Sequence, residues 1–167
     1  MKDVANKQSC PCGRQNAKGQ SLAYADCCGR YIDHWDAQPA PDAQALMRSR
    51  YTAYVLGKID YIVASTVPAQ QALLDVAAIE QWSRHTAWAG LTVHQHRPRI
   101  GKHHAQVHFS AAFDTAQGRQ QHNEHSAFVC IGARWYFIDP TVPLPTMKHP
   151  CFCGSGKKFK LCCGRFF

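Results

Sequence analysis

Apolar residues change their spacing once along the middle of the chain, close to Gly90. Before that point they recur at helical intervals between Asp42, a favourable N-cap, and Gly57, a favourable stop. The same spacing predicts a second, short helix over 59–66 and a third over 76–86, which Gly90 would end. The first half of the middle region is therefore predicted to be helical.

After Gly90 the pattern becomes a two-residue alternation, which is typical of half-buried β-strands. It is clearest over 104–113, where alanine, valine and phenylalanine alternate with histidine, glutamine and serine. Gly132 and Ala133 fit a tight hairpin between two strands. Helices followed by antiparallel strands predict an α+β fold, in which helices cover one face of the sheet. The other predicted strands are 91–97, 124–131 and 134–139.

Composition places this fold in one ordinary domain with small appendages. Of the 167 residues, 46% are apolar and 18% are charged, as in globular proteins. No apolar export signal precedes Cys10, and no stretch approaches the ~18 apolar residues of a membrane span. We therefore expect a cytoplasmic protein without a membrane span. Thiols stay reduced in that compartment, so the nine cysteines point to metal binding before disulfides.

Eight of the nine cysteines form an internal repeat at the two ends of the chain. Each copy begins with a Cys-x-Cys-Gly turn, which supplies two thiolates, and closes with a Cys-Cys-Gly-Arg segment, which supplies two more. Adjacent cysteines rarely bridge each other, so two tetrahedral zinc sites are predicted, with iron an alternative in the same thiolate cage. The ninth, Cys130, is predicted to be a core residue on a strand. The predicted ligands are Cys10, Cys12, Cys27 and Cys28 in the first copy and Cys151, Cys153, Cys162 and Cys163 in the second.

The C-terminal copy, residues 151–164 with the sequence CFCGSGKKFKLCCG, resembles the SEC-C motif, the metal-binding tail of the bacterial translocation motor SecA. Its eight residues between the two cysteine pairs fit that motif. The N-terminal copy has fourteen residues between its pairs and lacks the Gly-Ser-Gly-Lys-Lys segment, so it resembles the motif less closely.

Four further segments resemble the YchJ-like family, bacterial proteins with a SEC-C motif at one or both ends. The resemblance covers nearly the whole chain. It implies that the middle is a cone-shaped domain like nuclear transport factor two (NTF2-like), and it implies no activity. The segments are LAYADCCGRY over 22–31, LMRSRYTAYVLG over 46–57, EHSAF over 124–128 and WYFID over 135–139.

These observations divide the chain into three parts: an N-terminal zinc knuckle over 1–40, a central domain over 41–145 and a C-terminal zinc knuckle over 146–167. The predicted fold is α+β, with helices packed on a curved antiparallel sheet and a knuckle at each end. The formal charge of +8 falls to about +4 if both sites form, because a zinc ion with four thiolates carries 2 − 4 = −2. The basic balance therefore supports a nucleic-acid partner only weakly.

A cone-shaped domain would enclose a pocket, where a carboxylate beside a histidine would indicate acid–base catalysis. Two-residue spacing places His94 and His96 on one face of a strand. The alternation over 104–113, however, places its histidines on a solvated face, so no catalytic residue is predicted. The polar strand residues considered are His94, His96, His104, His108, Glu124 and Asp139.

Two surfaces suggest a macromolecular partner. Arg48 and Arg50 lie with tyrosines on one helix, and arginine with aromatics can bind nucleic acid. Near the C-terminus, lysines and phenylalanines suit an acidic, partly apolar protein partner. Alternatively, the lysines offset the charge of −2 at the metal site and the phenylalanines pin the knuckle to the central domain. These residues are Lys157, Lys158, Lys160, Phe152, Phe159, Phe166 and Phe167.

The sequence therefore favours a zinc-binding, non-enzymatic adaptor. The SEC-C resemblance implies a protein partner in the export machinery or the ribosome-associated machinery, and ribosomal RNA is a further candidate. The alternative is a small-molecule enzyme or binder, such as an isomerase, dehydratase or hydrolase, that uses the central pocket.

Overall fold

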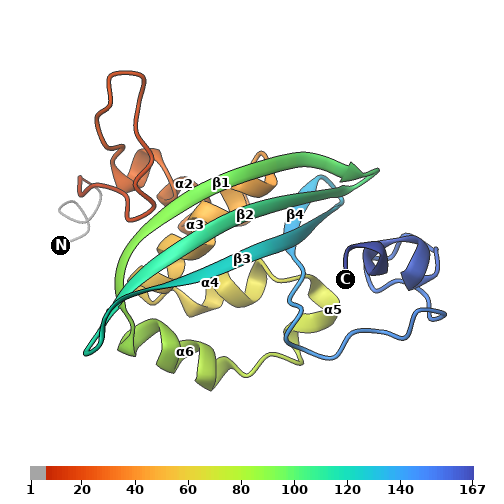
Figure 1. The fold of residues 1–167 in the computed structure, drawn as a ribbon. Helices are drawn as coiled ribbons and strands as arrows, with labels where there is room; N and C mark the ends of the chain where they lie inside the picture. The colour runs from red at the N-terminus through yellow and green to blue at the C-terminus, as the bar shows by residue number, and fades with distance from the viewer. Residues whose placement is uncertain (1–6) are drawn as a thin grey trace.

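The computed structural model describes residues 7–167, and its longest helix is the first one that the sequence predicts (Figure 1). Helix α3 spans Ala43–Leu56, and the carboxylate of Asp42 accepts a hydrogen bond of 2.8 Å from the amide of Ala45. The helix ends at Gly57, whose φ of 67° is costly for residues with a Cβ. Both predicted boundaries are confirmed.

Three shorter helices follow α3: α4 (Ile59–Ala64), α5 (Pro68–Gln71) and α6 (Val76–His85). The prediction that Gly90 ends the third helix is wrong, because α6 ends at His85 and the first strand begins at once. Gly90 lies inside that strand at a register shift, and its amide donates to the Tyr51 hydroxyl at 3.0 Å. It is a strand irregularity at a close contact with α3, one of the roles of glycine in a strand.

The second half of the middle region is a four-stranded antiparallel sheet in the order β1-β2-β3-β4. The strands are β1 (Ala87–Gly101), β2 (His104–Thr115), β3 (Gly118–Ile131) and β4 (Arg134–Phe137). Gly132 and Ala133 have φ of 56° and 64° and form the predicted tight hairpin. Strands β1 and β3 are longer than predicted, because they continue through polar segments that carry no apolar alternation.

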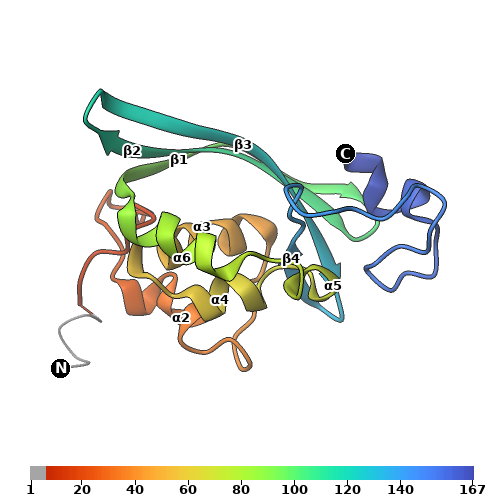
Figure 2. The same cartoon turned by 90° about the horizontal axis from the view of Figure 1, so that it is seen from below.

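The long strands arch over the helices, which cover one face of the sheet (Figure 2). Leu46 and Met47 of α3, Ile62 of α4, and Val107 and Phe128 of the inner sheet face share one buried cluster. The predicted α+β fold, with helices on a curved antiparallel sheet, is confirmed. None of the helices within residues 7–167 combines the length and the apolar character needed to cross a membrane.

A small cysteine-containing module lies at each end of this domain. The N-terminal module contains the 3-10 helix η1 (Tyr24–Asp26) and helix α2 (Gly29–Ile32). The C-terminal module contains two 3-10 helices, η2 (Phe159–Leu161) and η3 (Cys163–Phe166). The two modules lie at opposite ends of the sheet, as both views show (Figures 1 and 2).

Two candidate metal centres

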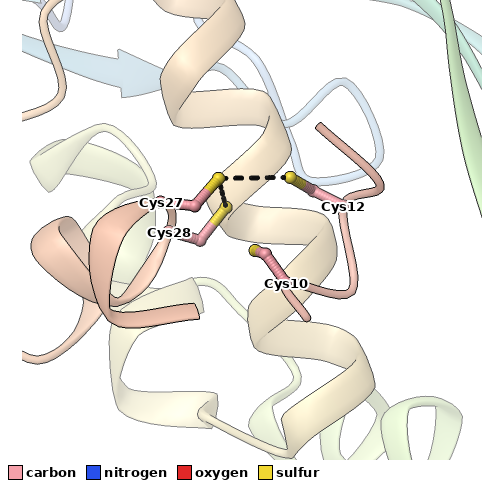
Figure 3. Close-up of side chains that lie close together, drawn as sticks. All are labelled: Cys10, Cys12, Cys27 and Cys28. Carbon is pink, nitrogen blue, oxygen red and sulfur yellow. Dashed lines mark hydrogen bonds between the residues drawn. The ribbon is translucent and has the colours of Figure 1, made fainter. Parts of the chain in front are cut away.

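The four N-terminal cysteines converge on one point beside α3 (Figure 3). Their sulfur atoms lie within 4.8 Å of one another, with 3.6 Å between the Sγ atoms of Cys12 and Cys27 and 3.9 Å between those of Cys27 and Cys28. A tetrahedral ion with four bonds of about 2.3 Å to sulfur separates its ligands by roughly 3.8 Å. The spacing of these thiols therefore fits a four-coordinate metal ion.

The four C-terminal cysteines form a second group of the same kind. Their sulfur atoms also lie within 4.8 Å of one another, and the Sγ atoms of Cys153 and Cys162 are 3.5 Å apart. The hydroxyl of Ser155 donates to Cys162 Sγ at 3.3 Å, a contact that supports a thiolate. The structure thus brings together the two sets of four that the sequence predicts.

The same backbone geometry builds both groups. The amide of Gly13 donates to the Cys10 carbonyl at 3.1 Å, and the amide of Gly154 donates to the Cys151 carbonyl at 3.2 Å. Both glycines have positive φ, 70° and 78°, which closes each Cys-x-Cys turn. A 3-10 helix precedes each Cys-Cys pair, and the first cysteine of each pair has nearly the same φ and ψ.

The glycine after each Cys-Cys pair is required by a close approach. A Cβ on Gly29 would lie 2.7 Å from the ring of Tyr24, and one on Gly164 would lie 2.7 Å from the ring of Phe159. Each would also meet the carbonyl oxygen of the same aromatic residue, at 2.8 Å and 2.7 Å. The Cys-Cys-Gly pattern is therefore a packing requirement against an aromatic residue five positions earlier.

The pKa shifts of the N-terminal cysteines favour a bound cation. In the first group, hydrogen bonds among the thiols, that from Cys12 foremost, lower the pKa of Cys10. The hydrogen bond with Cys10 is the main cause that raises the pKa of Cys28. Four thiols this close cannot all ionise against one another, whereas a divalent ion would hold all four as thiolates. Zinc and iron both take this donor set, so the identity of the metal stays a prediction.

The N-terminal group is part of the central core. Cys10 Sγ lies 3.6 Å from the Thr52 hydroxyl, and Arg48 Nη1 donates to the Cys12 carbonyl at 3.1 Å. All four cysteines are buried and share one cluster with the residues of α3. Arg48 therefore connects the helix to the module and is not a free nucleic-acid contact.

The C-terminal group packs on the outer face of the sheet. His104, at the start of β2, is only 6% exposed, and its Nε2 lies 3.3 Å from Cys163 Sγ. Burial lowers the pKa of His104, which favours the neutral ring, and the tautomer with Nε2–H can donate to a thiolate. The expectation that this histidine lies on a solvated face is wrong, because a segment 59 residues away covers it.

The phenylalanines of the C-terminal module mostly serve that packing. Phe159 is 1% exposed, and Phe166 lies 4.8 Å from His104 between ring centroids. Phe152 also packs against the cluster that joins the module to Val129 of β3. Of the aromatic residues considered for a docking surface, only Phe167 is exposed, at 44%.

The remaining polar candidates are dispersed. A register shift between Val93 and Gln95 separates the two β1 histidines. His94 lies on the outer face, 2.7 Å from the Ser110 hydroxyl, while His96 pairs with Val107 of the inner face. The expectation that these histidines share a face is therefore wrong.

The other residues singled out by the sequence are also dispersed. His108 lies on the outer face and stacks on His125, with 3.8 Å between ring centroids. Asp139 bonds to Thr141. Cys130 lies on β3 as predicted, but it is only partly buried and belongs to neither core cluster, so the prediction of a core residue is wrong.

Glu124 alone among these candidates faces a cavity, and a histidine that the sequence analysis missed lies beside it. Its Oε2 is 2.8 Å from His122 Nε2, and its Oε1 accepts a hydrogen bond from Ser126 at 2.5 Å. Burial raises the pKa of Glu124, but these two hydrogen bonds, together with the charges of His122 and Arg50, hold the pKa below its ordinary value. The same bond raises the pKa of His122. Extension of the predicted strand to residue 118 would have placed His122 on this face.

Comparison with known proteins agrees with this description. Residues 42–140 match the family model described as YchJ, middle NTF2-like domain, and residues 147–165 match the SEC-C motif. A UPF0225 protein of Actinobacillus succinogenes is 49% identical over 157 residues, 94% of this chain and 97% of that protein. A UPF0225 protein of Haemophilus influenzae is 49% identical over 159 residues, 95% of this chain and 93% of that protein.

Two solved structures are similar over most of their length. The crystal structure of a SEC-C motif containing protein from Psychrobacter arcticus has a TM-score of 0.92 and 49% identity, and covers 98% of this chain and 99% of that one. The solution structure of a SEC-C motif containing protein from Rhodopseudomonas palustris has a TM-score of 0.67 and 33% identity, and covers 79% of this chain and 96% of that one. The chain therefore belongs to the UPF0225 family of YchJ-like proteins, with an NTF2-like middle domain and a SEC-C motif.

Proposed function

We propose that this protein is a cytoplasmic, zinc-binding, non-enzymatic adaptor, and that its C-terminal module docks an acidic protein partner. One observation carries the proposal: three lysines and Leu161 stand exposed around a metal centre that already has four cysteine ligands. Leu161 is 58% exposed, and Lys157, Lys158 and Lys160 are exposed as well. None of these lysines takes part in a salt bridge among residues 7–167.

The chemistry of this surface fits a partner that is partly apolar and partly acidic. Exposed apolar side chains next to lysines gain by apolar burial and by charge pairing, and long-range attraction speeds the encounter. Residues 147–165 match the SEC-C motif. The resemblance of this motif to the tail of the translocation motor SecA is our reason to propose a partner in the export or ribosome-associated machinery. Ribosomal RNA would use the same positive charge.

The adaptor role predicts that the lysines act on the partner and not on the metal. Replacement of Lys157, Lys158 and Lys160 with alanine should leave two zinc ions per chain by elemental analysis. It should reduce capture of ribosomal or export proteins, and raised salt should reduce capture by wild type in the same way. A control that removes the same charge from the other module is Lys7, Arg14 and Lys18 to alanine, since all three are exposed.

The proposal fails if the two triple variants capture the same proteins as wild type across salt concentrations. It also fails if the control variant loses the partner and the C-terminal variant keeps it. Absence of zinc from protein purified without chelators would remove the metal part of the proposal.

A second function, a small-molecule enzyme or binder, is favoured by one observation, the pair of Glu124 and His122 at the inner sheet face. This pair lines a cavity between α3, α6 and the sheet. No reaction class follows from it, because a carboxylate and a histidine serve many chemistries.

A further inference from the structure

The cavity of the cone is mainly aromatic. It has a volume of about 90 Å³ and lies between helices α3 and α6 and the inner face of the sheet. A closed apolar cavity of about 150 Å³ binds benzene, so this smaller, partly open space takes at most a body of one ring. Its aromatic lining includes Tyr51, Tyr54, Trp88, Phe109, Phe128 and Phe137.

A buried cation outside any salt bridge forms part of this wall. Arg50 of α3 is only 8% exposed and lines the cavity, with its Cζ 4.2 Å from the centre of the Phe137 ring. No salt bridge among residues 7–167 includes it, and the carboxylates of Glu124 and Asp139 act on it only at longer range. A buried guanidinium without a directly paired carboxylate is costly, so its presence beside a cavity needs an explanation.

The hydrogen bonds of Arg50 leave one side of the guanidinium free. Nη1 donates to the Ile62 carbonyl at 2.8 Å, to the Ser65 hydroxyl at 2.7 Å and to the Thr66 hydroxyl at 3.3 Å. All the hydrogen bonds of this side chain within residues 7–167 come from Nη1, and Nε and Nη2 donate to none. Arg50 is thus anchored by one nitrogen, and the other two are available in the fork geometry that pairs with a carboxylate.

The one carboxylate in the cavity does not fill this role, because no hydrogen bond or salt bridge joins it to Arg50. Glu124 accepts from His122 with one oxygen and from Ser126 with the other. Glu124, His122 and Ser126 thus form a hydrogen-bonded group of their own, separate from the guanidinium. The cavity therefore offers free donors on a cationic group.

We propose that this cavity binds a small organic carboxylate with an apolar, ring-sized body, whose carboxylate pairs with Nε and Nη2 of Arg50 and whose body lies among the aromatic side chains. Two exposed rings also line the cavity: Trp82 is 41% exposed and the His122 side chain is 42% exposed, with 5.6 Å between their ring centroids. This site is separate from both metal centres, so it stands or falls independently of the adaptor role.

The test uses metal-loaded, full-length protein and benzoate as the probe. Two-dimensional 15N–1H NMR should show saturable shifts of the Arg50 Nε–H and the Trp88 indole N–H signals. Benzylamine, which has the same ring and the opposite charge, should shift neither signal at equal concentration. The carboxylate site is wrong if benzylamine binds as well as benzoate. It is also wrong if benzoate gives no saturable shift up to roughly 10 mM, a concentration that would nearly saturate a site with a Kd of about 1 mM.

Two variants locate the site. Arg50→Lys keeps the charge but cannot serve the Nη1 acceptors and a ligand together, so benzoate affinity should fall roughly tenfold or more.

Because Arg50 also anchors α3, Ala111→Phe provides an independent test. Ala111 is 4% exposed and lines the cavity, and the larger ring would fill the cavity while leaving Arg50 intact. It should abolish binding. Arg84→Met, on the exposed face of α6, is the matched control and should bind as wild type does. Undiminished binding by both cavity variants would overturn the proposal.

Discussion

The two cysteine modules have the same local geometry but different relations to the central domain. Each has a glycine turn after the first cysteine pair and a 3-10 helix and a crowded glycine around the second. The N-terminal cysteines, however, share a cluster with α3, whereas the C-terminal cysteines share one with the outer sheet face. A short sequence motif thus specifies a ligand set, and the surface beneath it decides what else depends on that set.

The burial of the cysteines also differs between the two modules. All four N-terminal cysteines are buried, whereas Cys153 of the C-terminal group is partly exposed. Exposed thiolates are more accessible to chelators and oxidants than buried ones. The N-terminal centre should therefore act as a structural element of the domain, and the C-terminal centre as a more accessible attachment.

The largest expected difference concerns the loss of one ligand from each centre. Cys28→Ser should lower the free energy of unfolding of the whole protein by roughly 3 kcal/mol or more, because it removes a metal ligand inside the central core. Cys163→Ser should lower the free energy of unfolding of the central domain by only about 1 kcal/mol, because the module then detaches from the outer face of the sheet. Urea unfolding followed by circular dichroism and tryptophan fluorescence measures both. Equal losses would contradict the asymmetry.

Substitution of the crowded glycines tests whether the shared backbone geometry is equally important in the two modules. Gly29→Ala and Gly164→Ala both place a methyl group 2.7 Å from an aromatic ring and beside a backbone carbonyl that cannot easily move. Each should reduce metal content, and Gly29→Ala should also lower global stability by about 2 kcal/mol. Asp26→Ala and Leu161→Ala, at exposed matching positions of the two 3-10 helices, serve as controls and should retain metal. Retention of metal by both glycine variants would show that the aromatic rings can yield.

The sequence predicted best what depends on neighbouring residues. Asp42 and Gly57 bound α3 because caps act locally, and the eight cysteines are recognised because each module is built from a short segment. The family resemblance supplied the cone-shaped middle domain. The position of the C-terminal module on His104 could not be predicted, since it depends on a contact across 59 residues.

The errors in the sheet have a different physical cause. Residues 118–123 form a strand whose side chains are mostly polar, so no apolar alternation marked it, and His122 was missed with it. A register shift after Val93 reversed the expected face of one histidine, and such shifts leave no signal in hydropathy. Arg50 was considered for nucleic-acid binding, but only its burial shows that it lines a cavity.

Substitutions that remove contacts between each module and the central domain should have intermediate effects. His104→Phe keeps the ring that packs on Phe166 but removes the nitrogen beside Cys163, and should speed metal release from the C-terminal centre alone. Arg48→Met removes the donor to the Cys12 carbonyl and should destabilise the protein by about 1 kcal/mol. Metal release to a chromogenic chelator should occur in two phases in wild type, and His104→Phe should accelerate only the faster one. An effect on the slower phase would contradict the assignment of the accessible centre.

The smallest expected effect concerns the extra residues of the N-terminal module, which form a hairpin of exposed residues over 15–20. Asn16 closes it by accepting from the amides of Lys18 and Gln20. Deletion of 15–20 leaves eight residues between the cysteine pairs, as in the C-terminal module. The shorter loop should change stability by only about 0.5 kcal/mol through closure entropy.

This deletion will succeed only with a glycine at the new turn. In the C-terminal module the matching position is Gly156, whose φ is 76°, and in the shortened module Ser21 would occupy it. Deletion combined with Ser21→Gly should retain metal and stability, whereas deletion with Ser21 kept should cost about 1 kcal/mol more, because a side chain disfavours positive φ. Elemental analysis and urea unfolding of the two variants measure the difference. Loss of metal from both would mean that the hairpin supports the centre, and that the two modules are less alike than their backbones indicate.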